Sequence, residues 1–303
     1  MLTVILFKDA ILGGKPEQSS LTMYYSIAMP GILVYIVACL LPLSVFGQQS
    51  RLIDEINEHT TGMAVWWAGH NSWLIKSGDE LIATDLYLEN GNRFEPAPIT
   101  PEELAPALDV SFVTHAHGDH FNAYTSRILL EKSDCVFVMP ESCLSEARNL
   151  KIPEKRIVVA TPREPLEVKG IEVQPIRAIH GNANFAIYYE ANLQDCGYLI
   201  TLDGKTVLQP GDSYLLEDHL FLEHVDVLFF SPTEHNMYID RSVILINKLN
   251  PDYIFPQHHS TVDYDESSRF WAKGYPDEVK VRLSQPLKDR YYILTPGDKV
   301  MIK

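Results

Sequence analysis

One short segment of the sequence combines four side chains that bind divalent metals. It reads THAHGDH, residues 114–120, and follows directly on a short apolar run. Because alternate residues of an extended chain point the same way, His115 and His117 can converge on one cation, while Asp119 and His120 turn toward a second. Imidazole and carboxylate are the ligands expected for zinc and similar ions. The segment therefore predicts a metal centre at the end of a strand.

Four ligands from one loop do not complete two metal sites, so further ligands must come from distant strand ends. The sequence offers His180, Asp212 and His258, with His259 as a competitor of its neighbour. Each lies where a predicted strand gives way to a loop, which is the usual position of functional groups on a rigid scaffold.

The elements that must position these residues are mostly short strands bounded by turn residues. Strands are predicted at residues 64–67, 72–76, 81–84, 110–113, 135–139, 156–160, 171–175, 185–190, 197–202, 206–208, 227–230 and 253–255. Helices are predicted at 101–108, 126–132, 140–150 and 241–249, the first with Thr100 as its N-cap. Many strands with occasional helices indicate sheets packed on each other with helices outside, in one domain.

The ordered set HxHxDH, His180, Gly211-Asp212 and His258 resembles the metallo-β-lactamase fold superfamily. The resemblance spans about residues 63–296 and implies an α+β fold, a single-domain αββα sandwich with a dinuclear metal centre along one edge of its sheets. A closer similarity, to the L-ascorbate-6-phosphate lactonase-like hydrolases, lies in residues 63–69, 153–159, 211–213 and 256–259. The sequence departs from the lactonase pattern around residues 182–194, so a phosphorylated-sugar substrate does not follow from it.

The resemblance implies seven metal ligands, three for each ion and one bridge. The first ion would be held by His115, His117 and His180, the second by Asp119, His120 and His258, and the bridge would be Asp212. The cofactors would be two divalent ions, zinc or else manganese or iron. A hydroxide shared by the ions would attack a small lactone or ester-like substrate, since bound water has a lowered pKa. Asp119 would also orient this nucleophile.

Three further polar residues are expected beside the ligands. His70 and Asp85 match positions at which the superfamily often has a histidine and an aspartate beneath the metals, where they would support the ligands. His235, in a polar loop after the strand at 227–230, is predicted as a second catalytic residue that contacts substrate or donates a proton. The resemblance also favours His258 over His259 as the ligand. Surface positions are expected for His59, His219 and His224.

Several functions compete with the hydrolysis of a lactone or ester. A phospholipase D-like phosphodiesterase shares the same ligand order. Hydrolysis of β-lactams is disfavoured because Asp212 stands where the best-known zinc β-lactamases carry a cysteine, and the flavodiiron redox class typically has a glutamate at the position of His117. From a different class comes a non-catalytic metal-binding protein of the cell envelope, which the complete ligand set argues against.

Composition narrows the partners. The chain has 303 residues, with 25 Lys+Arg against 40 Asp+Glu and a net charge of -15. Such an acidic chain lacks the basic footprint that neutralises phosphates, so nucleic acid is excluded and a small-molecule substrate is expected. The four cysteines are too few and too scattered for a disulfide scaffold or a cysteine zinc cluster.

The N-terminal segment, residues 1–47, differs from the rest. Residues 24–46 carry no charged side chain, and Lys8 and Lys15 precede them. About 20 apolar residues suffice to span a bilayer. The pattern predicts a signal peptide cleaved after Gly47, which leaves residues 48–303 as a periplasmic or extracellular hydrolase domain. The alternatives are an uncleaved membrane anchor, a lipid attached at Cys39 and a buried core helix.

Overall fold

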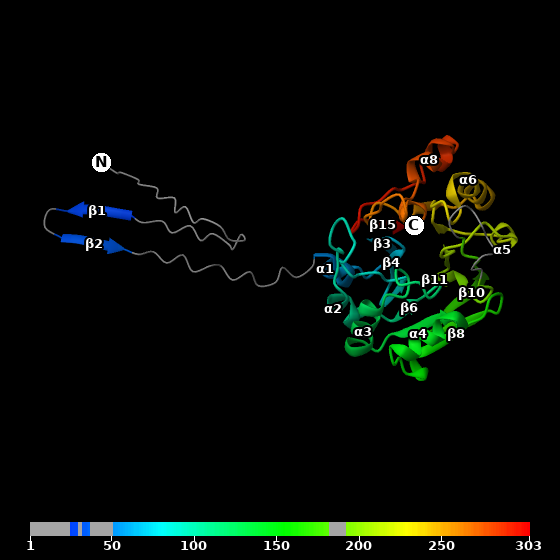
Figure 1. The fold of residues 1–303 in the computed structure, drawn as a ribbon, viewed down its shortest axis with the longest axis horizontal. Helices are drawn as coiled ribbons and strands as arrows, with labels where there is room; N and C mark the ends of the chain where they lie inside the picture. The colour runs from blue at the N-terminus through cyan, green and yellow to red at the C-terminus, as the bar shows by residue number, and fades with distance from the viewer. Residues whose placement is uncertain (1–24, 30–31, 37–50, 182–191) are drawn as a thin grey trace. The chain divides into compact units, whose positions relative to one another are not determined.

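The computed structural model describes residues 25–29, 32–36, 51–181 and 192–303 (Figure 1). The chain forms two compact units, residues 1–48 and 49–303. The described part of the first is an antiparallel pair of strands, β1 (Tyr25–Met29) and β2 (Ile32–Ile36). No helix within the described ranges is long and apolar enough to cross a membrane. The predicted cleavage point, Cys39 and most of the apolar run lie outside the described residues.

A seven-stranded sheet forms one half of the second unit, in the order β15-β3-β4-β5-β6-β7-β8. Its strands are β3 (Met63–Gly69), β4 (Ser72–Ser77), β5 (Glu80–Thr84), β6 (Val110–Phe112), β7 (Val136–Pro140), β8 (Ile157–Ala160) and β15 (Lys299–Ile302). Neighbours are antiparallel from β15 to β5 and parallel from β5 to β8. The last residues of the chain therefore complete the sheet beside one of its first strands.

A six-stranded sheet forms the other half, in the order β14-β13-β12-β11-β10-β9. Its strands are β9 (Leu166–Val168), β10 (Ile171–Arg177), β11 (Cys196–Leu202), β12 (Lys205–Gln209), β13 (Val227–Phe230) and β14 (Tyr253–Pro256). Pairing is antiparallel from β9 to β12 and parallel from β12 to β14. The strand predicted at 185–190 lies outside the described residues.

The two sheets pack face to face around a shared apolar core. In β3, Val65 and Trp67 belong to this inner core, whereas Ala64 and Trp66 belong to a second core on the outer face. This division follows from the alternation of side chains along a strand. Trp73 of β4 stacks on Phe229 of β13 with ring centroids 4.1 Å apart, which ties one sheet to the other.

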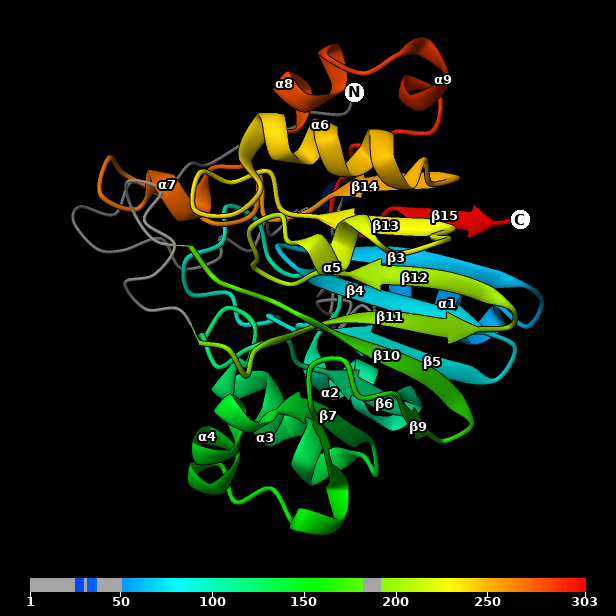
Figure 2. The same ribbon diagram turned by 90° about the vertical axis from the view of Figure 1, so that its right-hand side faces the viewer.

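Helices cover both outer faces. The seven-stranded sheet is covered by α1 (Arg51–Glu58), α2 (Pro101–Leu104), α3 (Ala123–Lys132) and α4 (Leu144–Asn149), the six-stranded sheet by α6 (Tyr238–Leu249), α8 (Pro276–Val281) and α9 (Gln285–Lys288). Figure 2 shows α6, α8 and α9 on one side of the strands and α2, α3 and α4 on the other. The short helices α5 (Glu217–Leu220) and α7 (Arg269–Ala272) complete the described set. The predicted αββα sandwich is confirmed.

Strand direction brings the predicted ligand loops to one edge of each sheet. Since β3 and β5 are both antiparallel to β4, and β6 is parallel to β5, all three end at the same edge. In the other sheet β10 and β12 are both antiparallel to β11, and β13 and β14 run parallel to β12. The loops after these strands thus share one edge in each sheet, and the two edges meet, because donor atoms on loops of both sheets lie within 4.8 Å of one another.

Candidate metal centre

Seven histidines and two aspartates gather at this edge, in overlapping groups whose donor atoms lie within 4.8 Å of one another. The groups are His115, His117 and His180; His70, Asp119, His120 and His258; His115, His120 and Asp212; and His180, Asp212 and His235. They come from the loops after β3, β6, β10, β12, β13 and β14. The structure thus brings together every predicted ligand, and it adds His70 and His235.

The first group lies toward solvent. Nε2 of the buried His115 is 3.0 Å from Nδ1 of His117, whose side chain is exposed. The His180 ring lies edge-on to His117, with centroids 4.6 Å apart. These three residues can hold one ion near the protein surface.

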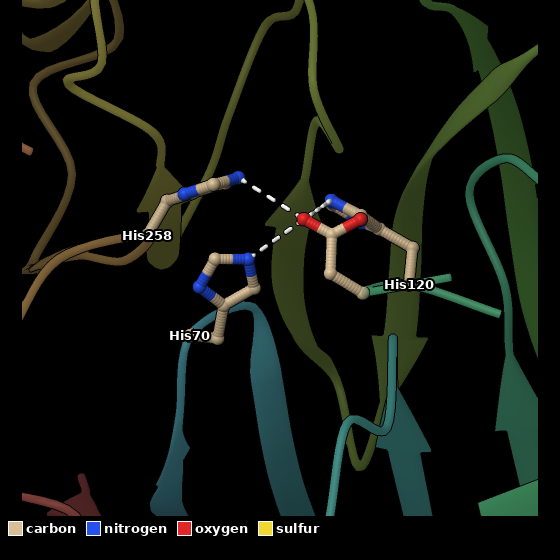
Figure 3. A group of neighbouring side chains, drawn as sticks. His70, His120 and His258 are labelled. Carbon is tan, nitrogen blue, oxygen red and sulfur yellow. Dashed lines mark hydrogen bonds and ion pairs between the residues drawn. The ribbon is translucent and has the colours of Figure 1, made fainter. Parts of the chain in front are cut away.

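The second group surrounds the carboxylate of Asp119. Figure 3 shows His70, His120 and His258, from three different loops, pointing toward one carboxylate, and their contacts identify it as that of Asp119. Oδ2 of Asp119 is 2.9 Å from Nε2 of His70, 3.9 Å from Nε2 of His120 and 3.8 Å from Nε2 of His258. The three imidazoles are buried, so this group lies deeper in the protein than the first.

Asp212 joins the two groups. Its Oδ2 lies 2.8 Å from Nε2 of His235 and 3.2 Å from Nε2 of His258. The same oxygen is 3.5 Å from Nε2 of both His120 and His180. A single buried oxygen is therefore in reach of imidazoles from both groups.

A layer of buried polar residues orients the ligands. Asp85 accepts hydrogen bonds from the backbone N–H of Thr114 and from its hydroxyl, both at 2.8 Å, and from Nδ1 of His120 at 3.0 Å. This contact turns Nε2 of His120 toward the centre, as supporting carboxylates do for metal-bound histidines. The side-chain amide of Asn71 lies 2.9 Å from that Nε2 and 3.5 Å from Asp212.

The backbone at this edge adopts conformations that most residues avoid. His70, Asp85 and His258 have positive φ angles of 54°, 44° and 58°. Such conformations cost about 1–3 kcal/mol each and cluster at functional sites, where the surrounding structure holds them. Gly211 has φ 64°, and a Cβ at this position would lie 2.7 Å from Cβ of Thr114. Only glycine lets the loop approach Thr114 so closely.

Burial and neighbouring charges shift the pKa values of the predicted ligands in both directions. Burial, and then the neighbouring His120, lowers the pKa of His115 well below its ordinary value, and burial with His180 lowers the pKa of His117. Burial opposes ionisation of Asp212, but His258 and His120 hold its pKa well below the usual range. Burial also opposes ionisation of Asp119, but His120, His70 and His258 together outweigh burial and hold its pKa well below the usual range. Burial opposes protonation of His120 and His180, but Asp212 raises the pKa of both, that of His120 well above its ordinary value. Neutral imidazoles and ionised carboxylates are the forms that bind metals, so an ion would displace the proton from these two rings.

Unpartnered nitrogens show that divalent ions fit these residues. Among the described residues, neither ring nitrogen of the buried His258 has a hydrogen-bond partner, and Nδ1 of His70 has none. Leaving a buried donor or acceptor unpaired costs about 1–3 kcal/mol. An ion coordinated by Nε2 of His258 would remove part of that cost, and the mixture of imidazole and carboxylate suits zinc, manganese or iron.

The centre forms the floor of a cavity with a volume of about 710 Å³. The floor is made by His117, Asp119, His180, Asp212 and His235, which all line the cavity. Because ligands from both groups face this space, a molecule held in the cavity would contact both metal positions.

The remaining predictions have mixed outcomes. His258 lies in the centre, whereas His259 is turned away, with Nε2 3.2 Å from the carbonyl of Pro256. The surface position expected for His224 is confirmed, but those expected for His59 and His219 are wrong, since both are buried. Asn71 was not predicted at all. Its only signal in the sequence is its place directly after His70.

Comparisons with known proteins agree with this architecture. Residues 64–258, more than half of the chain, match the family model described as Beta-lactamase superfamily domain. A UPF0173 metal-dependent hydrolase from Pyrococcus furiosus is 27% identical over 243 residues, which cover 78% of this chain and 98% of that protein. A second such hydrolase, from Thermococcus kodakarensis, is 24% identical over 241 residues, which cover 78% of this chain and 98% of that protein.

Solved structures share the fold. Igni18, a metallo hydrolase from Ignicoccus hospitalis, has a TM-score of 0.62 at 18% identity, covering 80% of this chain and 98% of that one. An isothiocyanate hydrolase from gut bacteria of Delia radicum has a TM-score of 0.62 at 17% identity, covering 78% of this chain and 98% of that one. Since the family match spans every strand that carries a predicted ligand, this chain belongs to the beta-lactamase superfamily and is a metal-dependent hydrolase with the metallo-β-lactamase fold.

Proposed function

We propose that the protein uses two divalent metal ions to hydrolyse a small lactone or ester-like substrate. The position of Asp212 supports this most directly, because one of its oxygens lies 2.8 to 3.5 Å from nitrogens of four histidines. A carboxylate between two groups of ligands is suited to bridge two ions. Such ions, when bound, would lower the pKa of water toward neutrality and polarise the bond to be cleaved.

The geometry supports the ligand assignment made from the sequence. His115, His117 and His180 would hold the first ion, Asp119, His120 and His258 the second, and Asp212 would bridge them. His70 then contacts Asp119 rather than an ion, since its Nε2 lies 2.9 Å from Oδ2 of that carboxylate. We assign it the task of orienting Asp119.

Asp119 is suited to orient the attacking water. Its side chain is 25% exposed and lines the cavity, whereas Asp212 is 2% exposed. With Oδ2 directed to His70, the other carboxylate oxygen is available to accept a hydrogen bond from water or to bind an ion. Asp119 would therefore act both as a ligand and as the group that aligns the nucleophile with the substrate.

His235 is assigned to the leaving group. Its Nδ1 donates a hydrogen bond to the carbonyl of Phe270 at 3.2 Å, and its Nε2 lies 2.8 Å from Oδ2 of Asp212. The ring also lines the cavity, so Nε2, once it has taken up a proton from the attacking water, would be in position to pass it to a leaving oxygen. Direct ligation is the competing role, because His180, Asp212 and His235 form one of the compact donor groups.

Metal content and turnover together test this function. The purified chain is expected to bind two equivalents of metal and to hydrolyse members of a panel of lactones, esters and phosphodiesters. His117→Ala and Asp119→Ala should lower kcat/KM by about 10²-fold or more, since several kcal/mol of charge stabilisation depend on the ions. The matched control is His224→Ala, which removes an exposed histidine outside the centre.

Two results would overturn the proposal. Absence of metal binding removes its basis, and two bound equivalents with no hydrolysis of any substrate class remove the catalytic assignment. His235→Gln separates the two roles of that residue. Full metal content with a fall in kcat supports proton donation, whereas loss of metal indicates ligation.

A further inference from the structure

The cavity above the metal centre has aromatic walls. Tyr87, Phe121, Phe270 and Trp271 line it, the first two buried and the last two half-buried. The Trp271 ring centroid is 6.4 Å from that of His258, and the Phe270 ring meets His235 edge-on at 5.9 Å. Apolar faces therefore begin directly beside the ligands, where the body of a bound substrate would lie.

The charged side chains on these walls are acidic. Glu89 and Glu146 line the cavity above Asp119 and Asp212, and no lysine or arginine lines it among the described residues. Glu89 is exposed and Glu146 is half-buried. The whole chain has a net charge of -15, so the electrostatic potential at the cavity entrance is negative, like the charges of Glu89 and Glu146.

Two arginines from neighbouring loops are held by other partners. Arg93 donates to the carbonyls of Tyr87 at 2.9 Å and Ala68 at 2.8 Å. The guanidinium of Arg269 lies 3.6 Å from a carboxylate oxygen of Glu234. Neither lines the cavity, so neither offers the forked pair of donors with which proteins recognise phosphate and carboxylate groups.

These walls favour one class of substrate. An anionic group beyond the reacting bond would face two carboxylates, with no lysine or arginine among the described cavity residues to balance it. Aromatic faces instead bury apolar groups and attract cations. Resting on the proposed hydrolytic function, we propose that the cavity selects small ester-like substrates without negative charge. Their apolar body would pack on Phe270 and Trp271, and their outer end, uncharged or cationic, would lie toward Glu89 and Glu146.

A matched series of esters tests the charge preference. The probes are p-nitrophenyl phenylacetates that carry a trimethylammonio group, no group or a sulfonate at the ring's 4-position. With metal-loaded protein, kcat/KM should be highest for the cationic or the neutral ester and about tenfold or more lower for the anionic one. In the double variant Glu89→Gln/Glu146→Gln, the ratio of kcat/KM for the cationic ester to kcat/KM for the anionic ester should fall about two- to tenfold. The change should lie mainly in KM, as expected for partly exposed charge pairs.

Control variants separate the cavity from general effects. Glu172→Gln removes an exposed carboxylate on β10 that does not line this cavity, and it should leave the ratio unchanged. Trp271→Ala should lower kcat/KM for the neutral phenylacetate but not for the smaller acetate ester. The inference is overturned if the anionic ester is preferred, or if the double glutamine variant keeps the original ratio.

Equilibrium binding distinguishes this inference from the proposed function. Titration calorimetry with the corresponding unreactive amides should give the same order, with the anionic amide weakest. If no ester is hydrolysed and the amides still bind in this order, hydrolysis of esters is refuted and the charge preference stands. If the esters are hydrolysed and the anionic amide binds most tightly, the charge preference is refuted and hydrolysis stands.

Discussion

Two buried aspartates stand at opposite ends of the same pair of parallel strands. Asp226 precedes β13 and accepts hydrogen bonds from the backbone N–H of Thr206 at 2.8 Å, from its hydroxyl at 2.9 Å and from the Lys205 ammonium at 3.2 Å. Asp212 follows β12 and has imidazoles for neighbours, with His235 at 2.8 Å and His258 at 3.2 Å.

The two carboxylates differ in whether their neighbours already supply the protons that hold them. The donors from Thr206 and Lys205 carry their own protons, and the exposed imidazole of His224 lies 3.3 Å from Asp226. Together these groups outweigh burial and lower the pKa of Asp226 to about 2. The imidazoles around Asp212 include one, His258, with no hydrogen bond on either nitrogen within the described structure. Their lone pairs attract a carboxylate only when a proton or a metal ion lies between them. We therefore infer that Asp226 stabilises the fold, whereas Asp212 binds a metal ion.

The largest expected effect comes from Asp212→Asn. Removing the charge of the bridge should lower kcat/KM about 10³-fold or more, because several kcal/mol of charge stabilisation depend on it. Added zinc should raise the Tm of the wild-type protein and of Asp226→Asn, but much less that of Asp212→Asn. Mass spectrometry of bound metal and thermal melts measure these effects. Equal metal content in both variants would erase the proposed difference between the two aspartates.

A smaller effect is expected from Asp85→Asn. This carboxylate is fully bonded, like Asp226, but it lies at the metal end, where it holds His120. Loss of such a supporting contact typically costs about 10- to 100-fold in metal affinity. Competition with a chelator measures it, and Asp226→Asn is the control. If both variants bind metal equally well, Asp85 serves only the fold.

Asp226→Asn should lower the free energy of unfolding by about 1.5 kcal/mol at pH 7, since hydrogen bonds to a charged group are lost. The folded pKa of Asp226 is about 2, below the value of about 4 in unfolded chains. Its contribution is therefore fully present above pH 4 and is lost as the pH falls through 2. Urea titrations at several pH values should show the two proteins converging over that range, and a constant difference would contradict this account.

The smallest effect is expected from Lys169→Met. Asp109 precedes β6 as Asp226 precedes β13, but its contact with Lys169, at 3.3 Å, joins side chains that are 35% and 41% exposed. Exposed pairs contribute about 0.5 kcal/mol or less. Chemical denaturation should therefore show a change near the error of the measurement, with kcat/KM intact. A loss of unfolding free energy as large as that of Asp226→Asn would show that burial does not explain the difference in stability between the Asp109 and Asp226 contacts.

Local signals were sufficient for much of the fold. The strand predicted at 227–230 has those bounds in the structure, and Thr100 accepts from the backbone N–H of Glu103 as an N-cap should. The third helix begins at Ala123 rather than 126, because Asn122 caps it. The strand Lys299–Ile302 was not predicted, because this short segment becomes a strand only through its pairing with the distant β3.

In the site, too, some features follow from local sequence and others only from tertiary packing. The ligand types and their positions at strand ends sufficed to gather His115, His180 and His258 in one place. Burial of His219 was not predictable, because it depends on α5 packing beside β10, where Arg177 of β10 pairs with Asp218 of α5. Local polarity indicates a surface position for such a residue, and only the tertiary contacts reverse it.

The strand β15 has a consequence for the order in which the protein is made. Its pairing with β3, together with the hydrogen bond from the backbone N–H of Trp67 to the carbonyl of Asp298, anchors the strand that leads into His70. Residues 298–302 are made long after β3, so this edge of β3 stays open while the strands between them are synthesised. We therefore expect metal to bind only after residues 298–302 have paired with β3, and deletion of these residues to slow metal loading.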